Sequence, residues 1–257
     1  MKDLGPARHL LGMKISRHHD KRQLFLSQTD YIGRVLEHFN MQSAKSASTP
    51  LPFNLRLSQR DCPTSGSEGE DMKSVPYAPA VSSLMYAMVA TRPDISHALG
   101  VVSKFMHNPG RSHWNAVKHV FKYLVGTKDH DILFGLNSTS GVVGYTDSDF
   151  AGCVDSRKST TRYCFKFGYG AMSWKSKLQE CTTTSTTEVE YVAASDATKE
   201  ALWLGCLAHT FWQVDSDWAP VVYNDNQGVV ALSKNPVHHN ASKHIYVRYH
   251  FVRDCVI

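Results

Sequence analysis

The chain has 257 residues, of which 42% are hydrophobic and 20% are charged, an ordinary composition for a globular protein with a sizeable core. No apolar run approaches the roughly 20 residues that span a bilayer, and the N-terminal residues lack the apolar stretch of a secretory signal. We therefore expect a cytoplasmic or nuclear protein that is neither secreted nor bound to a membrane. The six cysteines contain no CxxC pair, so they signal neither a zinc finger nor a disulfide framework.

Charge is distributed unevenly along the chain. Residues 1–139 contain 17 Lys and Arg against 11 Asp and Glu, whereas residues 140–257 contain 11 against 12. A basic first half can approach a polyanion such as nucleic acid, and a more acidic second half can carry a cation site. Random scatter over a solvated surface accounts for the same numbers, so charge alone leaves both interpretations open.

The first elements are a predicted hairpin and a predicted helix. Residues 8–28 contain two apolar segments around the polar turn HHDKR, which predicts two antiparallel strands. Residues 27–40 place apolar side chains at the 3,4 spacing of an amphipathic helix. Ser27 or Thr29 is the expected N-cap of this helix, because either hydroxyl can accept a free backbone N–H.

A long connection separates this start from a group of helices. Residues 44–76 are rich in Ser, Thr, Pro, Gly and acidic side chains without periodicity, which predicts an irregular segment. Residues 78–110 contain two helical patterns, and Pro93 fits the first turn of the second one. Residues 113–127 place a stripe of apolar side chains on one face and predict a third helix.

From Ser140 onward the pattern changes to short strands. The segments GVVGYTDSDF, TRYCFKFG and GAMSWKSK have strand composition and are separated by turn residues. A long amphipathic helix over residues 182–212 follows, with Thr187 as its expected N-cap, and then a strand over 221–225 and another helix. This order favours an α/β fold, with a mixed β-sheet flanked by helices.

Three carboxylates occupy comparable positions on these elements. Asp147 lies in the first strand of the set, Glu190 in the first turn of the long helix, and Asp225 at the tip of the last strand. Each alone has a structural explanation: a strand-end turn, a capping box and a helix cap, respectively. Together they could hold Mg2+, a hard cation that prefers oxygen ligands and that acts in pairs on phosphodiesters. From the residue types and positions alone, a structural role and a metal-binding role for these three carboxylates are equally well supported.

Several motifs closely resemble the ribonuclease H domain of copia-type retrotransposon Pol polyproteins: YTDSDFAGC, RKSTTRYCFKFG, STTEVEYVAAS and VYNDNQGVVALSKNP. Upstream, LGMKISRHHDKRQLFLSQTDYIGRVLEHFNM and HWNAVKHVFKYLVGT resemble the section that follows the polymerase aspartates of the same polyproteins. The resemblance covers nearly the whole chain. It implies a reverse-transcriptase C-terminal region over 1–135, with a palm hairpin and thumb- or connection-like helices, and a ribonuclease H-like domain over 140–257.

The resemblance further implies hydrolysis of the RNA strand of RNA–DNA hybrids during reverse transcription, with two Mg2+ ions or Mn2+ in their place. Asp147, Glu190 and Asp225 match the family's catalytic metal ligands. Asp149 and Glu188 belong to the same motifs and are expected on opposite strand or helix faces. The implied partners are an RNA–DNA hybrid or another nucleic acid and the rest of the Pol polyprotein, within a virus-like particle.

The sequence also departs from the family pattern. The chain begins after the position of the polymerase aspartates, so no DNA synthesis is expected, and it ends before a further strand and an acid-bearing helix of the family. We therefore expect a C-terminally truncated ribonuclease H-like domain. Arg162 stands where a glycine is common, and Tyr246 stands where an aspartate is usual. The alternative function is accordingly a degenerate, non-catalytic retrotransposon fragment that binds nucleic acid weakly at most.

Overall fold

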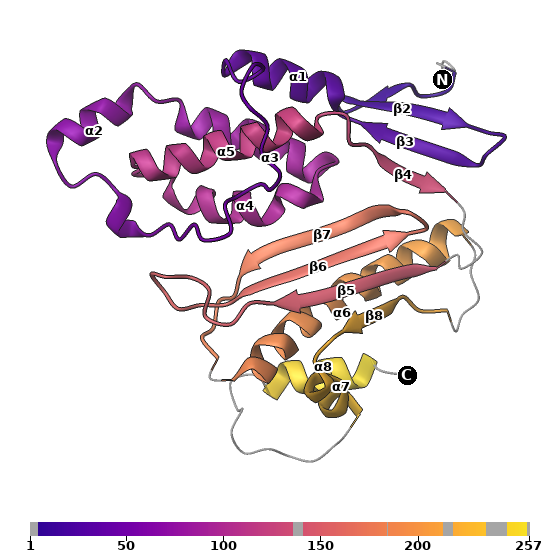
Figure 1. Ribbon diagram of the computed structural model, residues 1–257. Helices are drawn as coiled ribbons and strands as arrows, with labels where there is room; N and C mark the ends of the chain where they lie inside the picture. The colour runs from indigo at the N-terminus through magenta and orange to yellow at the C-terminus, as the bar shows by residue number, and fades with distance from the viewer. Residues whose placement is uncertain (1–4, 136–140, 184, 213–217, 235–245, 256–257) are drawn as a thin grey trace. The chain divides into compact units, whose positions relative to one another are not determined.

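The computed structural model describes residues 5–135, 141–183, 185–212, 218–234 and 246–255. The chain divides into two units, Met1–Gly135 and Leu136–Ile257, and each unit contains one four-stranded sheet together with helices (Figure 1). The expected mixture of α and β structure is therefore confirmed. Among the described residues, no helix combines the length and the apolar character that crossing a membrane requires.

The sheet of the first unit is antiparallel, with the strand order β1-β2-β3-β4. Its strands are β1 (His9–Leu10), β2 (Met13–His18), β3 (Gln23–Ser27) and β4 (Ile132–Gly135). The predicted hairpin is confirmed by the pairing of β2 with β3, from Lys14 opposite Ser27 to His18 opposite Gln23. Strand β4 was not predicted, because four apolar residues are too few to show a period.

The helices of the first unit enclose its apolar core. They are α1 (Thr29–His38), α2 (Gly66–Lys73), α3 (Tyr77–Ala90), α4 (Ser96–Val102) and α5 (Arg111–Thr127), with short 3-10 turns at Gln59–Asp61, Pro93–Ile95 and Ser103–Phe105. The core includes Ile32 of α1, Leu84 of α3, Leu99 of α4 and Phe121 of α5, all of them buried. The helices predicted before and after Pro93 are confirmed as α3 and α4. Their apolar residues pack into the same core.

Neither predicted residue is the N-cap of α1, although the Ser27 hydroxyl does accept the Thr29 N–H at 3.3 Å. The N-cap residue is Gln28, whose side chain makes no capping hydrogen bond. Gln28 is buried instead, and its Oε1 accepts a hydrogen bond of 2.8 Å from the Thr91 hydroxyl. Burial of this amide requires a polar partner, so the tertiary structure assigns Gln28 a role that local cap preferences do not predict.

The prediction of an irregular segment over 44–76 was also wrong in part, because α2 lies within it. The Ser65 hydroxyl accepts the Glu68 N–H at 3.3 Å, which caps the helix. Met72 is buried and attaches the last turn of α2 to the unit. A single apolar anchor in eight residues leaves no helical period in the sequence, although a helix forms.

Arg92 is a buried cation in the core of the first unit, with 1% of its surface exposed. Its Nη2 lies 2.7 Å from Asp94 Oδ2, and its Nη1 donates to the Thr127 carbonyl oxygen at 2.9 Å. The Tyr123 hydroxyl also donates to Asp94 Oδ2, at 2.7 Å. Burial by itself would raise the pKa of Asp94, but the hydrogen bonds and charge of Arg92 and the Tyr123 bond hold it below 3.8.

The sheet of the second unit is mixed, with the strand order β7-β6-β5-β8. The bounds are β5 (Val142–Ser148), β6 (Thr160–Phe167), β7 (Gly170–Leu178) and β8 (Val221–Asn224), with helices α6 (Thr186–Trp212), α7 (Gln227–Lys234) and α8 (Tyr246–Cys255). Strand β5 pairs antiparallel with β6 and parallel with β8. The predicted strands and the long helix are therefore confirmed.

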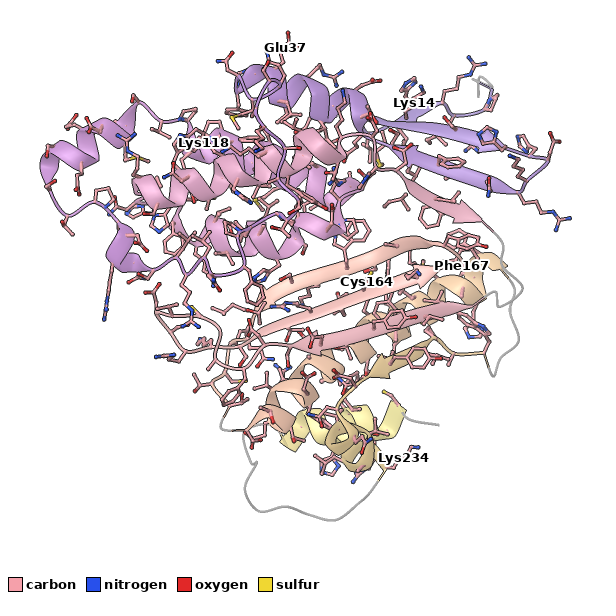
Figure 2. All side chains as sticks on the ribbon, viewed as in Figure 1. Lys14, Glu37, Lys118, Cys164, Phe167 and Lys234 are labelled. Atoms are coloured by element: carbon pink, nitrogen blue, oxygen red, sulfur yellow. The ribbon has the colours of Figure 1, made fainter. Side chains whose placement is uncertain are left out.

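Helix α6 covers one face of this sheet. Phe165 of β6 is fully buried in a cluster with Val142 of β5 and Leu204 of α6, and Phe167 packs against the same cluster. Cys164, labelled in Figure 2, comes directly before Phe165 on β6, so the alternation of strand side chains directs it to the other face. The alternation thus determines which residues of β5 and β6 face α6.

Gly144 on β5 lies directly opposite Phe165 and leaves space for its ring. A Cβ atom at position 144 would come within 2.4 Å of Phe165 Cε1. We expect Gly144→Ala to lower the free energy of unfolding of this unit by about 1–3 kcal/mol through overpacking, measured by urea denaturation. Phe165→Leu in the same chain should recover part of that loss.

Gly205→Ala is the matched control for this prediction. A Cβ atom at position 205 would meet Pro220 at 3.5 Å, an ordinary contact, and the residue lies inside α6. This substitution should leave the free energy of unfolding unchanged or raise it, because alanine favours helices over glycine. Equal losses in the two variants would contradict the steric explanation.

Candidate functional site

Two of the predicted carboxylates lie at the same edge of the second unit's sheet. Strands β5 and β8 are parallel, and the last residues that pair between them are Thr146 and Asn224. The next residue on each strand is an aspartate, Asp147 on β5 and Asp225 just past the end of β8. Because parallel strands present their carboxyl ends at one edge, the topology brings these two aspartates to neighbouring positions.

Glu190 of α6 reaches both strand ends. Its Oε1 accepts a hydrogen bond of 3.2 Å from the backbone N–H of Ser148, and its Oε2 accepts one of 3.2 Å from Asn224 Nδ2. The residue is 8% exposed. The two bonds, one to β5 and one to β8, hold the Glu190 carboxylate between the strands that carry Asp147 and Asp225.

The environment of Glu190 alters its protonation. Burial raises its pKa above the ordinary 4.5, hydrogen bonds from Asn224 and Ser148 oppose that rise, and the negative charge of Asp147 adds to it. Asp147 is therefore close enough for its charge to act on Glu190. A nearby cation would reverse this effect, since it favours the ionised carboxylate.

The expected structural roles of two of these acids do not apply. Asn226 rather than Asp225 caps α7, because its Oδ1 accepts the N–H groups of Gly228 at 2.9 Å and Val229 at 3.2 Å. Asp225 is exposed at the turn before the helix. Its position at the tip of β8 is thus not explained by capping.

Thr187 is not the residue that caps the start of α6. The Ser185 hydroxyl accepts the Glu188 N–H at 3.2 Å, so the cap lies two residues earlier than predicted. Glu190 is consequently not at the capping-box position after Ser185, and its carboxylate bonds to the strands instead. The helix begins at Thr186, so the cap falls on Ser185.

Asp147 turns toward a cation on the neighbouring strand. It is opposite Arg162 of β6, and the Arg162 Nη1 lies 3.4 Å from Asp147 Oδ2. The Arg162 Nη2 lies 3.5 Å from Asp149 Oδ2, and Asp149 also accepts the Thr160 N–H at 2.6 Å. Asp147 and Asp149 therefore share one face, contrary to the expectation of opposite faces, because strand side chains alternate with a period of two.

In the part of the chain that the structure describes, no three Asp, Glu, His or Cys side chains gather closely enough to hold a metal ion. Glu190 approaches from the α6 side, whereas the Asp147 side chain is 57% exposed and pairs with Arg162. The backbone thus brings three acidic residues to one edge, but the side chains as placed do not fit a shared metal ion.

Sequence reasoning missed the partners of these acids. Asn224 and Ser148 fix the Glu190 carboxylate, although 34 and 42 residues separate them from it. Arg162 was noted only as a departure from a family pattern, and its pairing with Asp147 depends on strand register. No local signal in the sequence predicts such contacts.

Comparison with known proteins shows extensive similarity to retrovirus-related sequences. The chain is 53% identical over 256 residues to the retrovirus-related Pol polyprotein from transposon TNT 1-94 of Nicotiana tabacum, which covers 100% of this chain and 19% of that protein. It is 36% identical over 256 residues to the Pol polyprotein from transposon RE1 of Arabidopsis thaliana, covering 100% and 17%. An uncharacterized mitochondrial protein of Arabidopsis thaliana is 37% identical over 203 residues, covering 79% and 80%.

These similarities define the class as the retrovirus-related Pol polyproteins. Within this class, the chain belongs to the Pol polyproteins of copia-type retrotransposons, which confirms the family that the motifs indicated. It spans less than a fifth of the length of the Pol polyproteins reported above. No family model matches the chain, and no solved structure matches it.

Proposed function

We propose that the second unit is a ribonuclease H-like domain that hydrolyses the RNA strand of RNA–DNA hybrids during reverse transcription. The observation that carries this proposal is the Glu190 carboxylate, which hydrogen-bonds to β5 and β8 where each strand presents an aspartate. We further propose that residues 1–135 are the C-terminal region of the reverse transcriptase. The rest of the Pol polyprotein would supply the polymerase aspartates.

Asp147, Glu190 and Asp225 are the proposed ligands of Mg2+, with Mn2+ as a substitute. Carboxylate oxygens are the ligands that these hard cations prefer. Glu190 is already held in place by two hydrogen bonds, whereas Asp147 must leave Arg162 to join a shared cation. Exposed ion pairs contribute only about 0–1 kcal/mol, so this rearrangement has a small cost.

The second candidate function is a non-catalytic retrotransposon fragment that binds nucleic acid weakly. The pairing of Arg162 with both Asp147 and Asp149 favours it, because a guanidinium already occupies the position that a cation would take between these carboxylates. Such a fragment would bind nucleic acid with an affinity that falls steeply with salt, and it would cleave nothing.

A cleavage assay on the purified chain separates the two functions. End-labelled RNA–DNA hybrid, RNA duplex and DNA duplex would be incubated with Mg2+ or Mn2+ and resolved by electrophoresis. The proposed function predicts cleavage of the RNA strand in the hybrid alone, and chelation of the cations should abolish it. Salt-dependent binding of the hybrid without cleavage at any concentration of either cation would establish the non-catalytic alternative.

Asp147, Glu190 and Asp225 together are called the acidic edge. Substitution of Arg162 should strengthen cation binding if the acidic edge is a metal site. Removing an ion pair worth about 1 kcal/mol should lower the Mg2+ dissociation constant of Arg162→Gln roughly fivefold, as measured by calorimetry without nucleic acid. Lys166→Gln on the same strand is the control, because Lys166 makes no described ion pair with these aspartates. Unchanged or weaker Mg2+ binding in Arg162→Gln would show that Arg162 does not compete with a cation.

A further inference from the structure

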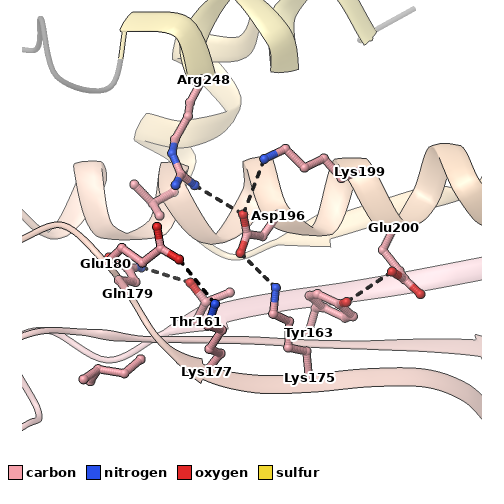
Figure 3. Close-up of a pocket in the computed structure, with 12 residues that line it drawn as sticks. Thr161, Tyr163, Lys175, Lys177, Gln179, Glu180, Asp196, Lys199, Glu200 and Arg248 are labelled. Carbon is pink, nitrogen blue, oxygen red and sulfur yellow. Dashed lines mark hydrogen bonds and ion pairs between the residues drawn. The ribbon is translucent and has the colours of Figure 1, made fainter.

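We propose that a polar cavity beside α6 in the second unit binds a phosphate group. The cavity has a volume of about 360 Å3 and is lined by residues of β6, β7, α6 and α8 (Figure 3). Among the described residues that line it, four are cationic and three are carboxylates: Lys175, Lys177, Lys199 and Arg248, and Glu180, Asp196 and Glu200. The lining therefore has an excess of positive charge.

This cavity is separate from the acidic edge. Val192, Asp196 and Lys199 line it from one stripe of α6, at the i, i+4 and i+7 spacing of a helix face. Glu190 lies two residues before Val192, about 200° around the helix. The cavity and the Glu190 carboxylate therefore occupy different sides of the same helix.

Three cations converge on the carboxylate of Asp196 (Figure 3). The Lys175 Nζ lies 3.2 Å from Oδ2, the Arg248 Nη1 lies 3.2 Å from Oδ1, and the Lys199 Nζ lies 3.9 Å from Oδ1. These cations carry about eleven N–H donors, whereas one carboxylate offers about four acceptor sites. One negative charge thus faces three positive charges, and most of the donors are available to a second anion.

The remaining carboxylates of the cavity reduce this excess without removing it, since the whole lining carries four positive and three negative charges. Glu200 accepts hydrogen bonds from the Tyr163 hydroxyl at 3.2 Å and from the Ser173 hydroxyl at 2.5 Å, and both donors are neutral. Glu180 pairs at 3.4 Å with Lys177. Neither carboxylate contributes an ion pair to the cations around Asp196 in the described contacts.

A phosphate group matches the chemistry of this cluster. Its oxygens accept several charge-assisted hydrogen bonds at once, and the planar fork of Arg248 can bind two of them side by side. The side chains of Lys175 and Arg248 are 33% and 29% exposed, so a ligand from solvent can reach them while partial burial limits screening. A purely structural role would instead use the cluster only to attach α8 to α6 and β7.

The test is calorimetric titration of the whole chain with inorganic phosphate at constant ionic strength. Lys175→Met with Arg248→Met should weaken phosphate binding at least tenfold. Lys199→Met removes the longest ion pair from a side chain that is 58% exposed, so it should fold normally and bind phosphate a few-fold more weakly. Lys166→Gln is the matched control and should bind as the wild type does.

Asp196→Asn distinguishes a phosphate site from a structural cluster, because the two roles predict opposite changes in phosphate affinity. It removes the charge that competes with phosphate, so this variant should bind phosphate several-fold more tightly and gain more thermal stability from it than the wild type. A structural clamp predicts the opposite, a less stable variant with no gain in phosphate affinity. Equal phosphate binding by the wild type, Lys199→Met and Asp196→Asn would overturn the proposal.

The same titration identifies the source of the phosphate. Displacement of inorganic phosphate by an RNA–DNA hybrid would assign the cavity to the backbone of a nucleic acid. Retention of inorganic phosphate in the presence of the hybrid would assign it to a free phosphate. Neither result requires cleavage, so phosphate binding by a chain that does not hydrolyse the hybrid would support this site and contradict only the proposed nuclease activity.

Discussion

Glu190→Gln is expected to reduce cleavage of the RNA–DNA hybrid by at least about 100-fold while the second unit stays folded. Groups that merely support a metal ligand already change activity or affinity by about 10–100-fold, and Glu190 is a proposed ligand. The glutamine oxygen can still accept the Ser148 N–H, which keeps the contact with β5. Its NH2 group would face the Asn224 Nδ2 donor, so the contact with β8 is lost unless Asn224 turns its amide and gives up the Asn226 N–H. Cleavage rates at saturating Mg2+ and the circular dichroism spectrum measure the two effects separately.

Glu188→Gln is the matched control for this variant. It makes the same chemical change two residues earlier on α6, at a side chain that is equally buried. Glu188 lies about 200° around the helix from Glu190, so its substitution should leave the cleavage rate within a few-fold of the wild type. Similar losses in both variants would mean that Glu190 supports the fold and does not contribute directly to cleavage.

Arg92→Met is expected to lower the free energy of unfolding of the first unit by about 3–5 kcal/mol. This is the usual cost of removing one partner of a buried ion pair. Here the Asp94 carboxylate and the Thr127 carbonyl oxygen both lose a hydrogen-bond donor. Urea denaturation followed by near-ultraviolet circular dichroism measures the change. Arg56→Met, at an exposed arginine of the same unit, should change stability by no more than about 0.5 kcal/mol.

The same interaction predicts a dependence on pH. The folded pKa of Asp94 lies below 3.8, its ordinary value, so its ionisation stabilises the fold fully above that value. The stabilisation is lost as the pH falls below 3.8 and through the folded pKa, because the carboxyl then becomes protonated in both states. Arg92→Met should show less of this acid-dependent loss. An identical pH profile in both proteins would contradict the role assigned to the pair.

Much of the secondary structure follows from local patterns. The apolar stripes of α1 and α5 and the alternation in β5 and β6 predicted these elements because burial against one face imposes a period of 3.6 or 2 residues. Short or weakly patterned elements were missed. Strand β4 forms by pairing with β3, where Leu26 lies opposite Ile132, and α2 has only Met72 as a buried anchor.

The sequence by itself determined the family, the mixed α/β character and the identity of the acidic residues at the strand and helix ends. Only the tertiary structure decided their partners, because strand register places Arg162 opposite Asp147, and the packing of α6 brings Glu190 to Asn224. Asp196 carried no signal of its own, since Lys175 and Arg248 reach it from other elements. Charge pairing acts through space, so residues distant along the chain determine whether a carboxylate is available to a metal ion.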